Sequence, residues 1–144
     1  MSYTKNQVEE SSGLDARLVQ YYTERQILTP GVDLGEGRGK VRKYSRKNVV
    51  EAGIIKYLAD YGMTVSRVRE IMAKVKGYIL FKRLFSSKGE LVKSVDSGQR
   101  VLLTVYDMRE VELKQMGSAI KKIEVSISGH RSALIIDITE GLKV

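Results

Sequence analysis

Helix-capping signals near the start of the chain place the tightest constraint on its fold. Thr4 and Gln7 have the spacing of a capping box, in which each side chain bonds the backbone N–H of the other residue. Gly13 is a normal place for a left-handed helix end, and Asp15 is a good N-cap for a second helix. Two short helices joined by a tight turn that contains glycine are typical of a helix-turn-helix.

The second of these helices, predicted over residues 16–26, has two unlike faces. One face is apolar and carries Leu18, Val19 and Tyr22, so Tyr22 is predicted to be a core residue. The other face is mostly polar, and its members are Arg17, Gln20, Tyr21 and Glu24. By itself this pattern also fits an ordinary amphipathic helix whose polar face is solvated.

The segment that follows, residues 28–47, predicts a basic hairpin. It is rich in glycine and holds the only proline of the chain, so we expect extended chain, a turn and a return strand. Its second half contains no acid and carries Arg38, Lys40, Arg42, Lys43, Arg46 and Lys47. Because basic side chains suit phosphate oxygens, this hairpin is predicted to be a wing that contacts nucleic acid. The alternative is a basic surface loop.

The charge of the whole chain points the same way. The net charge is +8 and the sequence pI is about 9.7, which favours an anionic partner, nucleic acid first among them. Residues 1–85 hold 16 basic and 9 acidic side chains, a net charge of +7. Residues 86–144 hold 9 and 8, a net charge of +1, so the positive charge belongs to the first part of the chain.

Two further helices are predicted before residue 77. Ser45 can cap the first of them, Gly62 ends it, and its apolar stripe is Val49, Val50, Gly53, Ile54, Tyr57, Leu58 and Tyr61. Thr64 can cap the second, whose apolar face is Val65, Val68, Ile71, Met72 and Val75, with an end near Gly77. Both stripes, the tyrosines included, are predicted to be core.

The stretches "YTKNQVEESSGLDARLVQYYTERQIL", "VRKYS" and "YGMTVSRVREIM" resemble, in order and spacing, the DNA-binding domain of MerR-family transcription regulators. The resemblance implies a mainly α winged helix-turn-helix domain over residues 1–76. It also implies sequence-specific binding of double-stranded DNA by a homodimer, at a palindromic promoter site that the protein distorts. RNA polymerase at that promoter is a further implied partner.

The same resemblance implies which residues contact DNA. Arg17 and Tyr21 are the expected contacts of the recognition helix, and Arg42 and Tyr44 those of the wing. The full set of candidates is Thr4, Ala16, Arg17, Gln20, Tyr21, Arg38, Lys40, Arg42, Lys43 and Tyr44. The chain departs from the family pattern at three positions: Asp15 stands where Ser is common, Gln20 where a basic residue is common, and Gln26 where Gly is usual.

Residues 77–144 are predicted to be a small α+β domain for dimerisation, effector binding or both. "YILFKRLF" fits either a helix or a core strand, while "ELVKSV", "RVLLTVYD", "KIEVSI" and "ALIIDI" read as strands. "REVELKQMGSAIK" between them reads as a helix, which gives a ββαββ order. A rival interpretation is a coiled-coil seam, because Leu113, Met116, Ile120, Ile123 and Ile127 are spaced 3, 4, 3, 4.

Several classes of function have no support in the sequence. The chain has no cysteine, which excludes disulfides and thiolate metal sites, and with them the cysteine-dependent metal and redox sensors of the family. His130 is the only histidine and is predicted to be a solvated turn residue. We expect no catalytic activity, no metal, no cofactor and no membrane segment, and a cytoplasmic protein. The alternative function is a DNA-architecture, plasmid-partition or excision-type protein with the same domain.

Overall fold

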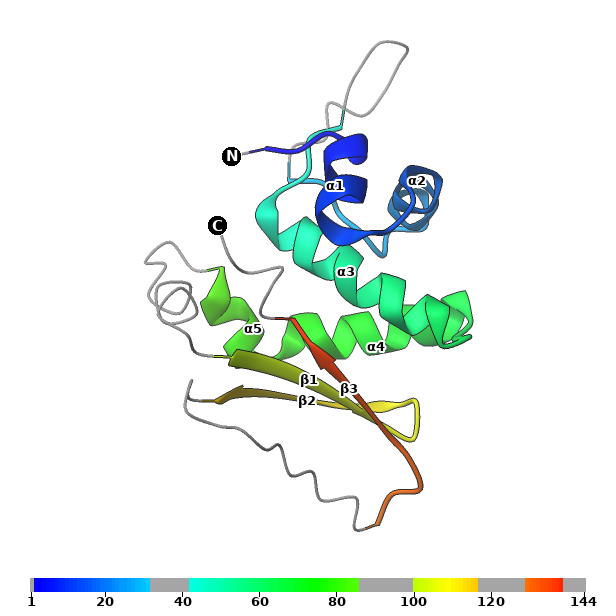
Figure 1. Ribbon diagram of the computed structural model, residues 1–144, viewed down its shortest axis with the longest axis vertical. Helices are drawn as coiled ribbons and strands as arrows, with labels where there is room; N and C mark the ends of the chain where they lie inside the picture. The colour runs from blue at the N-terminus through cyan, green and yellow to red at the C-terminus, as the bar shows by residue number, and fades with distance from the viewer. Residues whose placement is uncertain (1, 32–41, 86–99, 117–128, 139–144) are drawn as a thin grey trace. The chain divides into compact units, whose positions relative to one another are not determined.

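The computed structural model describes residues 2–31, 42–85, 100–116 and 129–138, and it forms two compact units that divide between Tyr61 and Gly62 (Figure 1). The N-terminal unit contains α1 (Lys5–Ser12), α2 (Ala16–Glu24) and α3 (Arg46–Asp60). The C-terminal unit contains α4 (Val65–Gly77), α5 (Ile79–Leu84), β1 (Arg100–Tyr106), β2 (Glu110–Met116) and β3 (Ala133–Asp137). A helical first part and a small antiparallel sheet later in the chain are thus confirmed.

The predicted caps of the first two helices are confirmed. The Thr4 hydroxyl accepts from the Gln7 N–H at 3.2 Å, and Gln7 Oε1 accepts from the Thr4 N–H at 2.9 Å, which makes the capping box. Gly13 has φ 82° and its N–H donates to the Glu9 carbonyl. Asp15 Oδ1 accepts from the Arg17 N–H at 2.8 Å and so begins α2 at the expected residue.

The exit from α2 comes earlier in the chain than predicted. The helix ends at Glu24, two residues early, and Gln26 adopts a left-handed φ of 61°. The Ile27 N–H then donates to the Tyr22 carbonyl at 2.9 Å, the six-to-one bond of a Schellman-type helix end. Gln26 therefore occupies a backbone conformation that glycine adopts at lower cost.

The core of the N-terminal unit forms where α1 packs against α2 and α3. Its most deeply buried apolar side chains are Val8, Leu14, Val19, Tyr22, Ile27, Leu28, Tyr44, Val50, Ala52, Ile54, Ile55 and Leu58. Burial of each large apolar side chain contributes about 1.5–3 kcal/mol, so these contacts, more than helix propensity, hold such short helices.

Three residues predicted to be core are exposed instead. Leu18 is 40% exposed, and Tyr57 and Tyr61 are 46% and 64% exposed. The apolar stripe predicted for α3 includes too many residues. In the last turns of the helix Leu58 is buried, whereas the two tyrosines lie on other faces and are exposed. The predicted end of that helix is confirmed by the left-handed φ of 84° at Gly62.

The start of α3 ties the surrounding chain together. Ser45 and Asn48 form a second capping box, and Asn48 Nδ2 also donates to the Thr29 carbonyl at 2.9 Å. Just before the helix, Tyr44 and Tyr3 exchange backbone hydrogen bonds of 2.8 Å in an antiparallel bridge. The predicted hairpin between Thr29 and Tyr44 lies mainly in residues 32–41, outside the described residues.

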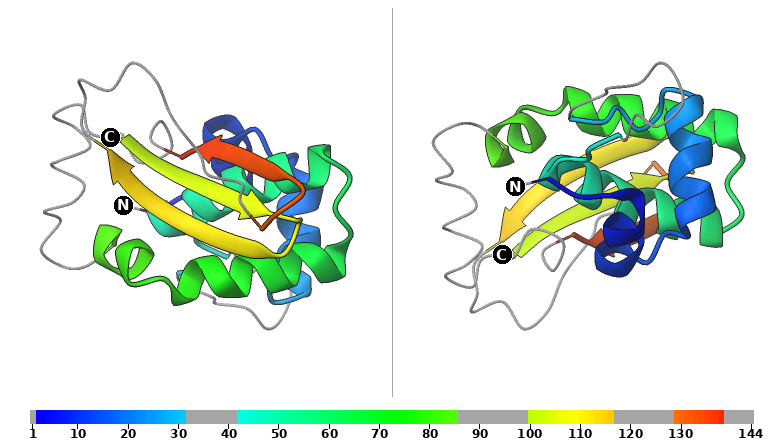
Figure 2. Two further views of the ribbon diagram at one scale, coloured as in Figure 1. Left: turned by 90° about the horizontal axis from the view of Figure 1, so that it is seen from below. Right: turned by 90° about the horizontal axis from the view of Figure 1, so that it is seen from above.

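In the C-terminal unit, two helices cover one face of a three-stranded antiparallel sheet of order β2-β1-β3 (Figures 1 and 2). Thr64 caps α4, as predicted, and the buried face of that helix is Val68, Ile71, Met72 and Val75. The segment after it, left open by the sequence, is a helix, α5, and Phe81 within it is fully buried. Because α4 packs against β2, it belongs with the sheet, while the domain boundary at residue 76 stays a prediction.

The helix predicted over residues 109–121 is wrong where the structure describes it. Residues Glu110–Met116 are β2, which pairs with β1 so that Leu103 lies opposite Leu113. Glu, Leu, Lys, Gln and Met favour helices, but pairing with a buried neighbouring strand overrides that preference. The coiled-coil alternative fails for the same residues, because Leu113 and Met116 point to opposite faces of a strand.

The other predicted elements of this part have separate outcomes. Strands over "RVLLTVYD" and "ALIIDI" are confirmed as β1 and β3. Those over "ELVKSV" and "KIEVSI", and the rest of the heptad seam, lie outside the described residues. Within the described ranges, no helix is both long and apolar enough to cross a membrane.

Candidate nucleic-acid interface

The outward face of α2 carries three of the predicted site residues. Arg17 and Gln20 are exposed, and Tyr21 is half-buried. Ala16 and Thr4 lie beside them at helix starts: the Ala16 N–H donates to Glu9 Oε2 at 2.8 Å, and Thr4 caps α1. The structure thus brings these predicted residues together around the helix-turn-helix.

Tyr21 is held in place by two neighbours. The guanidinium carbon of Arg25 lies 3.4 Å from the centroid of the Tyr21 ring, a close cation–π contact. The Tyr22 ring meets Tyr21 edge-on, with centroids 5.3 Å apart and an angle of 87°. Sequence reasoning missed Arg25, although its i, i+4 spacing from Tyr21 on one helix face is a signal that could have found it.

Gln20 is held by a second set of contacts. Lys5 Nζ on α1 donates to Gln20 Oε1 at 3.0 Å, and Gln20 Nε2 donates to Glu24 Oε1 at 3.0 Å. The bond to Glu24 follows from helical spacing, whereas the bond to Lys5 depends on how α1 packs against α2. The amide therefore has a fixed environment on an otherwise exposed face.

The inward residues of this region include two buried hydroxyl groups that lie together, those of Thr23 and Tyr44. Tyr22 is 4% exposed, as predicted for a core residue, and its burial, with a smaller contribution from Tyr21, raises its pKa above 10.0. Thr23 donates to the Val19 carbonyl at 2.7 Å, and its hydroxyl lies 2.8 Å from the Tyr44 hydroxyl. Tyr44 is 2% exposed, so its side chain supports α2 from inside rather than presenting a hydroxyl to phosphate.

The basic residues near α3 are distributed around its first turn. Arg42 and Lys43 are half-buried, and Arg46 and Lys47 open the helix. Nη2 of Arg46 is buried without a hydrogen-bond partner among the described residues. Arg38 and Lys40 lie outside the described residues. The described cations lie at the N-terminus of α3, which is the positive end of the helix dipole. The side-chain charges and the dipole together make a favourable environment for an anion.

Comparison with known proteins identifies the domain that carries this interface. The family described as "MerR HTH family regulatory protein" matches residues 3–75, just over half of the chain. The chain belongs to this family. A curated relative, the HTH-type transcriptional regulator CueR of Yersinia pestis, is 27% identical over 66 residues, which cover 46% of this chain and 45% of that protein. The alignment thus spans less than half of either protein.

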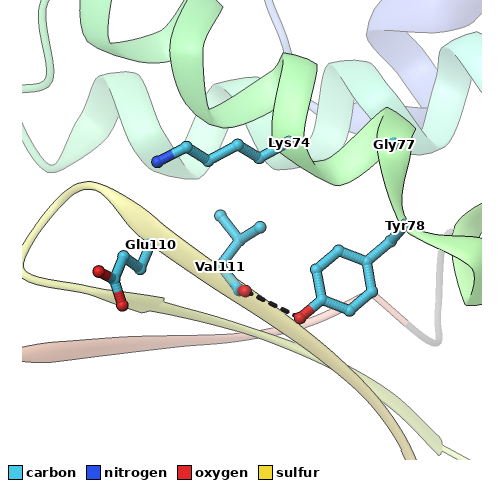
Figure 3. A pocket seen from close by; sticks show the side chains of 5 residues that line it. All are labelled: Lys74, Gly77, Tyr78, Glu110 and Val111. Atoms are coloured by element: carbon cyan, nitrogen blue, oxygen red, sulfur yellow. Dashed lines mark hydrogen bonds between the residues drawn. The ribbon is translucent and has the colours of Figure 1, made fainter.

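All described candidate residues of the interface lie within residues 3–75, which match the MerR family. A separate hollow is lined mostly by residues that follow this match. This hollow, beside α4 and β2, has a volume of about 490 Å³ and is lined by Lys74, Gly77, Tyr78, Glu110 and Val111 (Figure 3). Lys74 Nζ donates to the Arg109 carbonyl at 2.7 Å, and the Tyr78 hydroxyl donates to the Val111 carbonyl at 3.0 Å. Because these polar groups are satisfied by backbone carbonyls, they join helix to strand more than they converge on a ligand.

His130 was predicted to be a solvated turn residue, and this is wrong. Its Nδ1 lies 2.9 Å from Asp107 Oδ2, and its ring stacks on Tyr106 with centroids 4.6 Å apart. Asp107 Oδ1 also accepts from the Arg131 and Ser132 N–H groups at 2.8 and 3.1 Å. The described residues contain no group of three or more His, Cys, Asp or Glu side chains arranged to hold a metal ion. His130 therefore fastens the turn before β3 to the β1–β2 hairpin.

Proposed function

We propose that this MerR-family protein is a transcriptional regulator that binds specific double-stranded DNA through the outward face of α2. The observation that carries the proposal is the exposure of Arg17 and Gln20, with Tyr21 beside them, on the second helix of a helix-turn-helix. In such a motif the second helix enters the major groove, where side chains of this kind reach base edges.

Phosphate contacts would supply most of the affinity. Residues 1–85 carry the net charge of +7, and the half-buried Arg42 and Lys43 lie at the base of the proposed wing, which would extend through Arg38 and Lys40. Contacts with phosphate fix the position of a protein on the duplex and make its affinity depend strongly on salt.

The proposed unit of function is a homodimer on a palindromic promoter site. Residues 86–144 have a net charge of only +1, and strands β1 and β3 within them are rich in β-branched residues. Such a region suits contact with a second protein chain better than contact with phosphate. Two linked half-sites would bind far more tightly than one. Distortion of the spacer between them would cost several kcal/mol, which the dimer contacts would offset.

Selection of bound sequences from random duplex DNA tests this function directly. A spaced palindrome is the expected result, and a preference for bent or supercoiled DNA without a sequence motif would favour the DNA-architecture alternative instead. On the selected duplex, Arg17→Ala should weaken binding by about 1–3 kcal/mol if Arg17 contacts a base edge. Arg83→Ala removes the same charge from α5 and is the matched control, which should leave the preference for the selected duplex over random duplex unchanged.

An equal loss on selected and random duplexes would mean that Arg17 touches phosphate only. No loss on either duplex would remove α2 from the interface and contradict the proposed function.

A further inference from the structure

The amide of Gln20 lies between two partners with opposite hydrogen-bonding requirements. Lys5 Nζ approaches its oxygen at 3.0 Å, and Glu24 Oε1 approaches its nitrogen at 3.0 Å. The ammonium group of a lysine can only donate, and an ionised carboxylate can only accept. The amide oxygen must therefore face Lys5 and the amide nitrogen must face Glu24, because the flipped amide would place donor against donor and acceptor against acceptor.

These two bonds use half of the hydrogen-bonding capacity of the amide. A carboxamide has two lone pairs on oxygen and two hydrogens on nitrogen, so one acceptor position and one donor position remain. Gln20 is an exposed residue, so its side chain is open to contact with a ligand. In the major groove, adenine offers the complementary pair, an N6 donor and an N7 acceptor, whereas guanine offers two acceptors.

We propose that Lys5 and Glu24 orient the Gln20 amide so that it reads adenine in the major groove, which makes Gln20 a specificity-determining residue and its two partners positioning residues. The inference rests on the proposed function, because it requires α2 to enter the groove. It goes further by naming the base and the device that selects it. An amide that is free to flip presents either order of donor and acceptor, whereas a fixed amide presents only one.

Electrostatics separates this role from a contribution to general affinity. Lys5 and Glu24 carry opposite charges, so together they add nothing to the net charge of the interface. Glu24 alone would repel phosphate, and its presence on the outward face of α2 is unfavourable for nonspecific binding. Orientation of the Gln20 amide is a role for this carboxylate that fits its hydrogen bond from Gln20 Nε2.

The experiment compares base preference with overall affinity in the full-length protein. After selection of the preferred duplex, each base pair of the half-site is changed in turn, and binding is measured for the parent and for Gln20→Ala. We expect one A·T pair whose replacement weakens the parent by roughly tenfold, a preference that Gln20→Ala abolishes. Glu24→Ala and Lys5→Met should each reduce this preference severalfold, whereas Lys5→Arg, which keeps a donor-only group, should retain it.

A measurement on the free protein tests the positioning step separately. The side-chain amide proton resonances of Gln20 should shift in Glu24→Ala and stay near their parent positions in Lys5→Arg, with equal melting temperatures in all three proteins. Unmoved resonances together with an unchanged base preference in Glu24→Ala would overturn the positioning role.

The failures of the two proposals can be told apart. If the protein selects a sequence and Arg17→Ala weakens binding, but Gln20→Ala leaves every base preference intact, α2 is the recognition helix and the adenine inference is wrong. A selected preference for guanine opposite Gln20 would overturn it as well. If no sequence is selected and Arg17→Ala has no effect, the proposed function itself fails and the inference fails with it.

Discussion

The helices of the N-terminal unit begin and end at local signals, whereas the sheet of the C-terminal unit depends on pairing between distant residues. Thr4, Asp15 and Ser45 each accept a hydrogen bond from a backbone N–H within three residues, which fixes the residue at which each helix begins. In the other unit, β1 lies between β2 and β3, and Leu103 has Leu113 on one side and Ile136 on the other. The first kind of order is set by neighbours in the chain, and the second only by the fold.

The largest expected effect distinguishes the two tyrosines of the locally ordered unit. Tyr22→Ala should lower the free energy of unfolding by about 3 kcal/mol, because it removes a buried aromatic ring from the core. Tyr21→Ala removes a half-buried ring and its contacts with Arg25 and Tyr22, so it should cost less stability than Tyr22→Ala, about 1 kcal/mol, and should weaken binding to the selected duplex. Chemical denaturation and a DNA titration of both variants would measure this. A Tyr22→Ala protein that unfolds like the parent but fails on DNA would reverse the assignment.

The next effect tests whether residues 110–116 behave as a strand. Leu113 is 6% exposed and lies on the face of the sheet that also carries Val111, whose side chain points toward α4 in Figure 3. Leu113→Ala should cost about 2 kcal/mol or more of stability, whereas Met116→Ala, on the opposite face, should cost less than about 1 kcal/mol. Denaturant unfolding gives both values. Equal large losses would be the result for a coiled-coil seam that contains both side chains.

The difference between local helix signals and distant strand pairing explains how much of the fold could be predicted from the sequence. Capping boxes and glycine ends lie within a few residues of the helix that they define, so α1, α3 and α4 were placed almost to the residue. For Glu110–Met116, local composition favours a helix, and only the pairing with β1 makes it a strand. The turn before it holds Asp107, a usual turn residue, followed by Met108 at positive φ where glycine is favoured, so the sequence lacks the Asp-Gly or Asn-Gly signal of a hairpin.

The candidate site divides in the same way. The exposure of Arg17 and Gln20 and the burial of Tyr22 follow from helical periodicity, which the sequence carries. The contacts of Tyr44 with Thr23 and of Lys5 with Gln20 join segments that are distant in sequence, and no local sequence pattern predicts them. The family resemblance supplies candidate positions for the interface but not the partners that hold each side chain.

A smaller effect concerns backbone strain, and it can be tested in both units by the same kind of substitution. Gln26 after α2 and Met108 after β1 have φ values of 61° and 59°, a conformation that costs a side-chain-bearing residue about 1 kcal/mol. Gln26→Gly should therefore raise the free energy of unfolding by up to about 1 kcal/mol, less the entropy that glycine adds to the unfolded chain. Met108→Gly should act in the same direction.

Thermal unfolding of each variant would measure the gain. Gln20→Gly, placed inside α2, is the control for glycine in a helix; it should instead destabilise by roughly 1 kcal/mol or more, because it also removes the bonds to Lys5 and Glu24. If Gln26→Gly is as destabilising as the control, the side chain of Gln26 makes contacts whose loss outweighs the relief of strain.

The smallest effect is a pH dependence confined to the C-terminal unit. The hydrogen bond with His130, and then those from the Arg131 and Ser132 N–H groups, lower the pKa of Asp107 below its ordinary value of 3.8. The unfolded chain therefore takes up this proton at a higher pH than the folded protein does. The contribution of the carboxylate is complete at neutral pH and is lost as the pH falls below about 4 toward the lowered pKa.

Asp107→Asn should therefore lower the melting temperature at neutral pH, while the curves of parent and variant should converge as the pH falls below about 4. Amide hydrogen exchange locates the effect. The N–H groups of Arg131 and Ser132 should lose protection in acid as Asp107 is protonated. The Gln7 N–H, bonded to the Thr4 hydroxyl, has an acceptor that does not titrate and should keep its protection. Parallel melting curves across this range would show that Asp107 does not couple the two turns. Loss of protection at Gln7 together with Arg131 would show that acid unfolds both units as one, and the contrast between local and distant order would not extend to their stability.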